Sequence, residues 1–490
     1  MNPRPTHHRA DLAEIAKNAM IDRGLEPAFT AAELQQLVGI TGPANETGPD
    51  LRDLTALLWC SIDNDDSRDL DQLTVSETLP DGATKLLVAI ADVDAVVRKG
   101  TPIDDHARAN TTSVYTACCI FPMLPERLST DLTSLNADQD RLSMVTEMIF
   151  DRAGTLASSS IYRARVRNKS KLAYDSVAAW LEGKAEEPAA AKAMAGMDAQ
   201  LRTQDALAQK LRALRHEQGA LDLETIQPKA VFSGDDVVDF RQEAHNRARQ
   251  VIEEFMVATN GVTARFLSAK GFAALRRVVR SPERWQRIVD AALESGEVLP
   301  SEPDARALEN FLVKRRAADP LRFPDLSLTI VKLMGAGEYV VETPGGTSVG
   351  HFGLAVRDYT HSTAPNRRFP DLITSRLLKA ALAGTATPYP GGELEELAKH
   401  CTEQEDNANK VERQVRKSAA ALFLASRIGQ HFDAIVTGAS PKGVFVRLLT
   451  PPVEGKLMRG EVGLKVGRKI SVQLVGTNVE RGFIDFVRLS

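Results

Sequence analysis

The stretch SIDNDDSRDLDQLTV (Ser61–Val75) places several aspartates between two apolar runs, ALLWCSI before it and KLLVAIADV after it. The apolar runs are typical of buried strands, and carboxylates held between such strands repel one another unless a cation lies among them. In an extended chain Asp69 and Asp71 point to the same side, and Asp63 can join them across the intervening turn. Their oxygens suit Mg²⁺ or Mn²⁺. The alternative, a solvated acidic loop, fits poorly with the apolar flanks.

Four later blocks continue a pattern that begins with this stretch. They are LLVAIADV (Leu86–Val93), NTTSVYTACCIFPMLPERLSTDLTSL (Asn110–Leu135), RQVIEEFMVATN (Arg249–Asn260) and HFGLAVRDYTHSTAPNRRFPDLITSRLLKAAL (His351–Leu382). Taken in order, the blocks resemble those of the ribonuclease II (RNB) exoribonucleases, whose metal-binding signature has similar acidic spacing. A single pair of acids would not carry this resemblance.

The resemblance implies an α+β fold with a large mixed α/β RNB catalytic domain, which we expect at residues 51–430. Before it, apolar spacing in DLAEIAKNAM and a capping box of Thr30 and Glu33 predict a small helical domain at residues 1–50. These helices are either the start of a helix-turn-helix or a helical cap on the core. Residues 431–490 contain short strands separated by Gly and Pro, which predict a β-barrel similar to the ribosomal S-one-type OB fold.

A ribonuclease II relative is expected to hydrolyse single-stranded RNA processively from the 3′ end and to release nucleoside 5′-monophosphates. The resemblance implies that Asp63, Asp69 and Asp71 bind Mg²⁺ or Mn²⁺, and that Asp69 and Asp71 are catalytic. Gln72 stands where the family has a fourth acid, and its amide oxygen is a weaker ligand for a hard ion. Arg367 matches the family arginine whose planar fork binds the terminal phosphates, and it completes the expected catalytic set.

Other positions are implied to contact RNA. Tyr115 matches the aromatic residue that stacks on the 3′-terminal base, and Leu223 stands where its aromatic partner is expected. Tyr174 and Glu253 match residues that sense the ribose, with Glu254 as the alternative if the register slips by one. Two further positions are assigned beside the terminal phosphates and the leaving nucleotide: Arg368 and Glu412. For Glu412 the alternative is an i,i+4 pair with Arg416 on a helix.

In the C-terminal barrel, Phe445 alternates with Val444 and Val446 in GVFVRL. This spacing predicts that Phe445 faces outward as a platform for stacking RNA bases, with Lys442 and Arg447 near the RNA backbone. The alternative is that Phe445 belongs to the core of the barrel.

The net charge of −4 argues weakly against a nucleic-acid partner, so the distribution of basic residues matters more than their sum. Alternating cations along a strand, together with a metal site, predict a channel for a polyanion. The alternative is a set of solvated basic faces. The candidate groups are Arg163, Arg165, Arg167, Lys169 and Lys171; Arg276, Arg277 and Arg280; and Arg367 with Arg368.

The sequence has no apolar run long enough to cross a bilayer, and its four cysteines have neither zinc-binding spacing nor a disulfide framework. We therefore expect a monomeric cytoplasmic protein whose partner is single-stranded RNA, with no membrane and no obligate protein partner. His351 and His361 lie in a block expected to be structural, so neither is assigned a metal or acid–base role.

Two other classes of function stay open. An RNA-binding regulator with a weakened or inactive nuclease site is indicated by Gln72 and Leu223. A DNA-directed or phosphatase-like metal hydrolase is permitted by the acidic cluster alone, although the RNA-type barrel disfavours it.

Ribonuclease II relatives usually carry two cold-shock-type OB folds before the catalytic domain. The residues before position 51 are too few for even one such barrel with its linker. We expect an enzyme of this form to trim a 3′ overhang nearer to a stem than a relative with a full set of barrels does.

Overall fold

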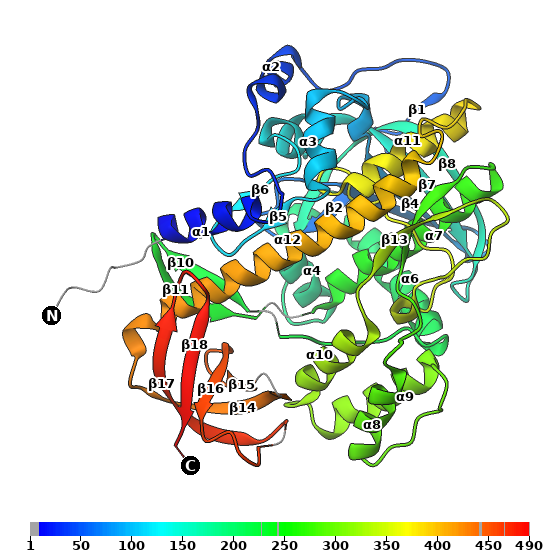
Figure 1. Ribbon diagram of the computed structural model, residues 1–490. Helices are drawn as coiled ribbons and strands as arrows, with labels where there is room; N and C mark the ends of the chain where they lie inside the picture. The colour runs from blue at the N-terminus through cyan, green and yellow to red at the C-terminus, as the bar shows by residue number, and fades with distance from the viewer. Residues whose placement is uncertain (1–8, 227, 243–244, 441–442, 465, 490) are drawn as a thin grey trace.

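The structure, a computed structural model, describes residues 9–226, 228–242, 245–440, 443–464 and 466–489. A seven-stranded sheet lies at the centre of the main domain, in the order β1-β8-β7-β4-β3-β2-β9 (Figure 1). Neighbouring strands are antiparallel except for β1–β8 and β2–β9, which are parallel. The strands are β1 (Leu51–Asp53), β2 (Cys60–Asp63), β3 (Gln72–Thr78), β4 (Thr84–Ala91), β7 (Asp140–Phe150), β8 (Leu156–Arg167) and β9 (Ser170–Ala173).

Strand β4 shows why this sheet forms the core. Its last six residues, LLVAIA, are all buried, which is the pattern of a strand covered on both faces. Helix α6 (Met197–Glu217) packs on β3 and β4, and α7 (Arg247–Ala269) packs on β7 and β8. Helix α11 (Phe369–Ala383) packs on α7. The sheet and these helices share one hydrophobic cluster, to which Leu86, Phe255 and Leu377 belong.

Shorter elements complete the main domain. They are η1 (Val93–Ala95), α3 (Pro102–Asn110), β5 (Val114–Tyr115), β6 (Ile120–Phe121), η2 (Arg127–Leu132), α4 (Tyr174–Leu181), α5 (Ala189–Lys192), β10 (Lys229–Ser233), β11 (Asp236–Arg241), β12 (Ala274–Val278), β13 (Glu338–Glu342) and η3 (Phe352–Leu354).

Helix α12 (Glu393–Leu424) connects the main domain to the C-terminal barrel (Figure 1). Its first half packs into the main core through Leu397 and Cys401. Its second half packs into a cluster shared with the barrel through Val415 and Phe423. Within the described part of the chain, every helix, α12 included, is too short or too polar to span a membrane.

Five strands form the closed C-terminal barrel, in the order β14-β15-β16-β18-β17. Val444 and Val446 are buried in its core, whereas Phe445 between them is half-buried and lies on the outer side of β15. The role of Phe445 in base stacking stays a prediction. The strands are β14 (His431–Ser440), β15 (Gly443–Leu448), β16 (Glu454–Arg459), β17 (Lys469–Asn478) and β18 (Phe483–Arg488), and η4 (Ala425–Arg427) precedes them.

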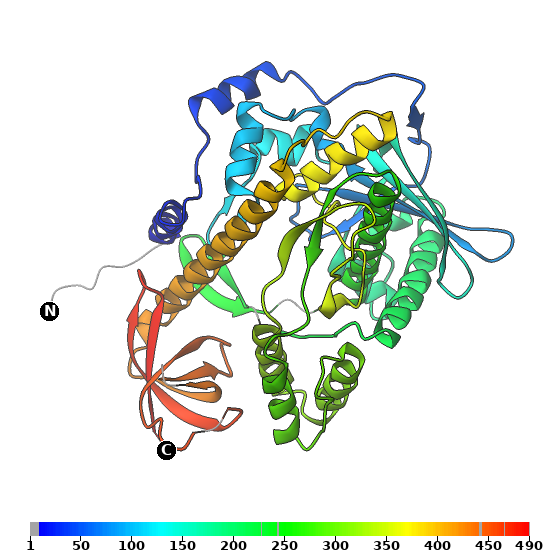
Figure 2. The same ribbon diagram turned by 45° about the vertical axis from the view of Figure 1, so that its right-hand side comes forward.

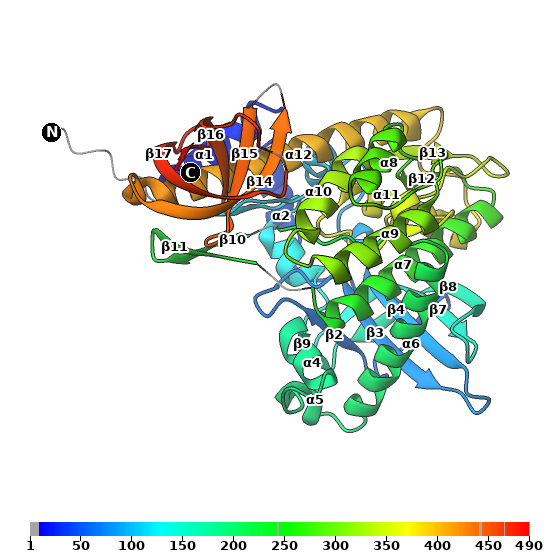
Figure 3. The same cartoon turned by 90° about the horizontal axis from the view of Figure 1, so that it is seen from below.

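Arg447 of the barrel is not available to RNA. Its guanidinium forms a buried ion pair with Asp325 at 2.9 Å. Asp325 belongs to a three-helix subdomain of α8 (Trp285–Glu294), α9 (Ala305–Ala318) and α10 (Phe323–Met334), which lies beside the barrel (Figure 3). The ion pair therefore joins the barrel to this subdomain, and the expectation that Arg447 contacts the RNA backbone is wrong. Lys442 lies outside the described residues.

The two N-terminal helices pack on different parts of the main domain. Helix α1 (Arg9–Ile21) packs on α12 and α2 (Ala31–Gly39) packs on α3, with an extended segment between them (Figure 2). The predicted capping box is present, because Thr30 and Glu33 exchange two side-chain to backbone hydrogen bonds. The arrangement is that of a helical cap, so the helix-turn-helix interpretation, which needs paired helices, is wrong. That residues 1–50 form a domain stays a prediction.

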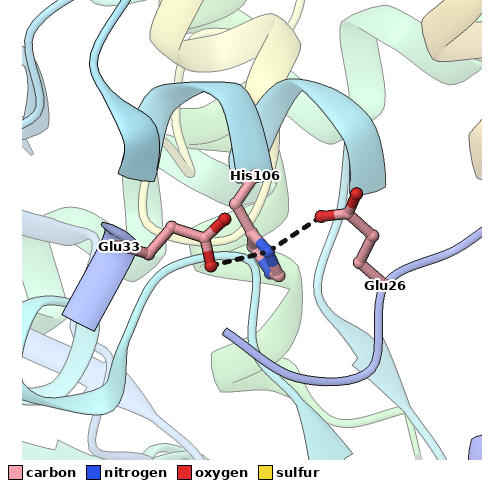
Figure 4. A group of neighbouring side chains, drawn as sticks. All are labelled: Glu26, Glu33 and His106. Carbon is pink, nitrogen blue, oxygen red and sulfur yellow. Dashed lines mark ion pairs between the residues drawn. The ribbon is translucent and has the colours of Figure 1, made fainter. Parts of the chain in front are cut away.

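His106 of α3 joins this cap to the main domain, buried between Glu26 and Glu33 (Figure 4). Its Nδ1 lies 3.2 Å from Glu26 Oε2 and 3.5 Å from Glu33 Oε2. The orientation of the Asn110 amide is fixed, because its oxygen accepts from the Glu26 N–H and its nitrogen donates to the Glu26 carbonyl. The same nitrogen lies 3.1 Å from His106 Nε2, so Nε2 accepts and Nδ1 carries the proton.

Acidic side chains pair with several of the arginines that the sequence pattern assigned to an RNA channel. On β8, Arg163 pairs with Glu46 and Asp92, and Arg167 pairs with Asp140. The second group pairs in the same way, as Arg276–Glu342, Arg277–Glu405 and Arg280–Glu338. These ion pairs disfavour a phosphate-channel role for Arg163, Arg167 and the second group. Among the described ion pairs none involves Arg165, Lys169 or Lys171, and for these three residues the channel stays a prediction.

Candidate active site

The connection between β2 and β3 positions the acidic cluster. Strand β2 ends at Asp63 and β3 begins at Gln72. Between them Leu70 is buried in the core, and its N–H donates to Ser134 Oγ at 2.9 Å. Asp69 and Asp71 flank Leu70, so the extended chain directs both carboxylates to the side opposite Leu70. The local sequence therefore creates an acidic face by alternating one apolar anchor with two acids.

Asp71 is the most buried acid of the cluster, with 2% of its surface exposed. Its Oδ1 accepts a hydrogen bond from the Asn366 N–H at 3.0 Å, and its Oδ2 lies 3.5 Å from Arg367 Nε. Burial raises the pKa of Asp71 to about 7, repulsion from Asp69 acts in the same direction, and Arg367 opposes both. A buried carboxylate with incomplete neutralisation is a site where an additional cation is stabilised.

Asp69 is tied to Tyr115 and, through it, to Glu412. The Tyr115 hydroxyl donates to Asp69 Oδ2 at 3.1 Å, and the Tyr115 N–H donates to Glu412 Oε1 at 2.9 Å. Burial raises the pKa of Asp69, and the charge of Asp63 adds to the effect. The alternative assignment of Glu412, an i,i+4 pair with Arg416, does not include this hydrogen bond to the Tyr115 backbone. Among the described ion pairs there is none between Glu412 and Arg416.

Asp63 lies beside Tyr174 at the other end of the cluster. The residue before Tyr174, Ala173, is the register partner of Asp63 in the β2–β9 pair. Burial raises the pKa of the Tyr174 hydroxyl, and the charge of Asp63 acts in the same direction. The Arg249 guanidinium stacks on the Tyr174 ring at 4.5 Å and donates to Asn64 Oδ1 at 2.7 Å. Tyr174 is thus held against the acidic cluster by a cation from α7.

The structure distinguishes the two neighbouring glutamates of α7. Glu254 is 2% exposed and forms a close ion pair with Arg215 inside the domain. Glu253 is exposed, and its carboxylate lies 3.3 Å from the same arginine. Glu253 stands one helical turn after Arg249, so both project from the same face of α7. Glu253 is therefore the member of the pair that a ligand can reach.

A cavity of about 700 Å³ opens beside these residues and is large enough for a nucleotide. A smaller cavity of about 200 Å³, lined by Arg367 and Arg368, lies next to it. Tyr115 and Glu412 line both cavities, so the Tyr115 ring stands at their boundary. The larger cavity is lined by Asn64, Ser67, Asp69 and Arg416 among others.

Residues 51–384 match the RNB domain, and residues 430–489 match the RNase II-type exonuclease C-terminal S1 domain. The chain belongs to the RNB family. Ribonuclease R of Aquifex aeolicus is 33% identical to it over 417 residues, which cover 82% of this chain and 57% of that protein. Ribonuclease R of Escherichia coli is 30% identical over 497 residues, covering 93% and 60% respectively. The chain therefore spans less than two thirds of the length of these relatives.

Solved structures show the same fold. The apo form of Mycoplasma genitalium RNase R superposes with a TM-score of 0.88 at 24% identity, covering 98% of this chain and 78% of that one. Yeast Ssd1, a pseudonuclease, superposes with a TM-score of 0.71 at 16% identity, covering 90% and 55%. The expected RNB fold with a C-terminal OB-type barrel is confirmed.

Three other residues that the sequence analysis assigned to the site are placed differently from Asp63, Asp69 and Asp71. Gln72 is half-buried at the start of β3. Arg368 pairs with Asp371 at 2.7 Å, which makes it a support for the loop before α11. Leu223 packs against the core of the α8–α10 subdomain and does not line the cavity beside Tyr115. The structure therefore brings Arg367, but not Leu223, to the acidic cluster.

Several residues of the site were missed by the sequence analysis. Asn366 supplies the backbone N–H that binds Asp71, although the two residues are 295 positions apart. Ser67 donates to Asp63 Oδ1 at 2.9 Å, and Arg249 anchors both Tyr174 and Asn64. The polar composition of the turn NDDSR was a usable signal for Ser67 and Asn64. No pattern in the sequence near Asn366 or near Asp71 indicates that these two residues are in contact.

The donor chemistry of this RNB site fits a hard divalent ion. Asp63, Asp69 and Asp71 offer only carboxylate oxygens, and burial raises the pKa of Asp71. In the described residues these three acids are not so close that one oxygen of each lies within 4.8 Å of the others. Mg²⁺ suits such spacing, because it keeps several waters and uses one or two carboxylates together with substrate phosphates.

Proposed function

We propose that this RNB-family chain is a processive 3′-to-5′ hydrolytic exoribonuclease. Its substrate is single-stranded RNA, its products are nucleoside 5′-monophosphates, and its ion is Mg²⁺, with Mn²⁺ as a substitute. The observation that carries the proposal is the position of Asp71 and Arg367 next to the exposed ring of Tyr115, because one site then offers a metal ligand, a phosphate-binding cation and a base-stacking surface. Relatives named Ribonuclease R and solved RNase R complexes with single-stranded and double-stranded RNA support it.

In this proposal each residue of the site has a role that follows from its chemistry. Arg367, with 43% of its side chain exposed, binds the phosphate at the reacting end with its planar fork. Tyr115 stacks on the terminal base, and its hydrogen bond to Asp69 fixes the distance between base and acids. Tyr174 and Glu253 contact the ribose, where the 2′-hydroxyl distinguishes RNA from DNA. A divalent ion held by Asp63, Asp69 and Asp71 would supply Lewis-acid polarisation of the phosphate and an activated water.

The barrel supplies a second RNA contact in this proposal. Phe445 on the outer side of β15 stacks on a base upstream of the reacting end. The protein acts as a monomer in the cytoplasm.

An RNA-binding regulator is the alternative, and one observation favours it. Gln72 places an uncharged amide directly after Asp71, where a carboxylate would otherwise strengthen the affinity for the ion. The regulator would bind RNA through Tyr115 and Phe445 and leave it intact.

The test is digestion of an oligoribonucleotide labelled at its 5′ end, with Mg²⁺, and with the same DNA sequence as a comparison. The proposal expects stepwise shortening from the 3′ end, release of 5′-monophosphates and an intact DNA. Asp71→Asn is the matched control for contaminating nucleases. Binding without shortening would establish the regulator, and equal cleavage of DNA would establish the broader metal hydrolase.

A further inference from the structure

Two adjacent cysteines lie in the turn between β5 and β6. Tyr115 and Ile120 are register partners, and the four residues between them form the turn. The Sγ atoms of Cys118 and Cys119 lie 3.6 Å apart, and each lies 3.5 Å from Thr116 Oγ1. The Thr116 N–H donates to the Cys119 carbonyl at 3.0 Å, which closes the turn. The conformation of the thiol pair and the position of Tyr115 are therefore set by the same few bonds.

The turn lies between two cavities. Tyr115, Thr116 and Ala117 line the cavity of the candidate active site. Cys119 lines an open cavity of about 480 Å³ on the other side, together with residues of α1 such as Lys17. A small oxidant can thus reach Cys119 from solvent without entering the RNA site.

The two thiols have different surroundings. Cys118 is buried, and its carbonyl accepts two hydrogen bonds from the Arg9 guanidinium. Cys119 is partly exposed. The contact with the Cys118 sulfur lowers the pKa of Cys119; Thr116 and the charge of Arg9 act in the same direction, and burial opposes them. Cys119 therefore has the exposure and the thiolate character of a reactive cysteine, and Cys118 is an adjacent resolving thiol.

We propose that Cys118 and Cys119 form a redox-modification site that controls the position of Tyr115. The oxidant is a peroxide. The Cys119 thiolate attacks one peroxide oxygen, the O–O bond breaks, and sulfenic acid and hydroxide form. The Cys118 thiol then attacks the Cys119 sulfur, an S–S bond replaces the S–O bond, and the hydroxyl leaves as water with the thiol proton. Overall two thiols are oxidised and one peroxide is reduced to two waters.

Closing this bond must change the turn. Adjacent Cα atoms are about 3.8 Å apart across a trans peptide, whereas ordinary disulfides join Cα atoms about 4.4–6.8 Å apart. The Sγ atoms must also approach from 3.6 Å to about 2.05 Å. The resulting ring is strained, so thiols reduce it readily. Its closure displaces the Thr116 contacts and with them the Tyr115 bonds to Asp69 and Glu412.

The experiment treats the purified full chain with hydrogen peroxide and compares it with Cys118→Ser and Cys119→Ser. Intact mass and peptide mapping report the modification without reference to activity. We expect wild type to lose two hydrogens at the peptide that contains the pair, and dithiothreitol to restore them. Neither serine variant should form the bond. Thiols that stay free in the mapped peptide at a peroxide dose that oxidises free glutathione would overturn the site.

The effect on RNA rests on the proposed function and is measured on the same samples. We expect oxidised wild type to need roughly five- to tenfold more RNA for half-maximal digestion, the size of a partly lost base–aromatic stack. Cys118→Ser should digest RNA with the same half-maximal concentration before and after peroxide. If oxidised wild type needs the same RNA concentration for half-maximal digestion as reduced wild type, the thiol pair does not control the position of Tyr115. If reduced wild type fails to digest RNA, the proposed function is wrong. Oligonucleotide binding before and after peroxide then still tests whether oxidation of the thiol pair changes the position of Tyr115.

Discussion

Tyr115 and Asp69 are joined by a hydrogen bond of 3.1 Å between a phenol hydroxyl and a carboxylate. The backbone N–H of the same tyrosine is held by Glu412 of α12. With 40% of its surface exposed, the ring is therefore accessible to a ligand while both of its ends are fixed. One residue couples the place where a base would stack to the acids that would bind the ion.

Two substitutions separate these roles of Tyr115. We expect Tyr115→Ala to weaken RNA affinity by about 1–3 kcal/mol, because a base–aromatic stack is lost. Tyr115→Phe keeps the ring and loses only the bond to Asp69, so it should leave affinity nearly unchanged and lower the maximal rate. Steady-state digestion measures both effects. If the two variants weaken affinity equally, the ring does not stack on RNA.

Asp71→Asn should abolish hydrolysis and retain RNA binding. The amide keeps the shape of the side chain and removes the charge that would hold the ion. Fluorescence anisotropy with a labelled oligoribonucleotide measures binding, and product release measures turnover. Asp81→Asn, in an exposed turn remote from the cluster, is the matched control. Turnover near the wild-type rate in Asp71→Asn would remove this residue from the chemistry.

Gln72→Asp tests the departure from the family pattern. A carboxylate next to Asp71 adds a hard anionic ligand, so the Mg²⁺ concentration for half-maximal digestion should fall by roughly tenfold or less. Gln72→Asn is the neutral control and should not lower it. A titration of activity with Mg²⁺ gives the answer, and an unchanged requirement in Gln72→Asp places this side chain outside the metal environment.

Arg447→Ala leaves Asp325 buried without its partner. Removing one member of such a pair costs about 3–5 kcal/mol, whereas replacing both by apolar residues is often neutral. We expect Arg447→Ala to lower the melting temperature and to expose the barrel to protease. The double variant Arg447→Met with Asp325→Leu should recover most of the loss. Equal destabilisation of the single and double variants would show that the charge pair itself is not what joins the barrel to α10.

The possible ligand atoms of Glu26, Glu33 and His106 lie within 4.8 Å of one another, but we expect this group not to bind a metal. The proton on His106 Nδ1 occupies the position that a metal would take. We therefore expect Zn²⁺ and EDTA to leave the melting temperature unchanged, and His106→Ala to lower it by removing a buried side chain that packs between two carboxylates. Scanning calorimetry is the measurement. A Zn²⁺-dependent rise in wild type that is absent from His106→Ala would contradict the assigned tautomer.

The acidic cluster could be predicted because its geometry is local. Alternation around buried Leu70 is enough to place Asp69 and Asp71 on one side, and the fold followed from long ordered blocks. The partners of charged residues were not local. Arg163 and Arg167 looked free in a basic strand, but Glu46, Asp92 and Asp140 reach them only when the sheet forms. The packing of Leu223 was not local either, because the side chain lies against the core of the three-helix subdomain.

Helix α12 sets a fixed separation within the molecule. A continuous helix rises about 1.5 Å per residue, so the segment from Glu412 to Leu424 holds the barrel end about 18 Å from the residue that orients Tyr115. The barrel is held at this end of the helix, because Val415 and Phe423 of α12 pack into the cluster that they share with the barrel. If RNA contacts both Phe445 and Tyr115 as proposed, this stretch of α12 contributes a fixed length to the distance that the RNA must span, and oligonucleotides below a minimum length would engage only one of the two residues.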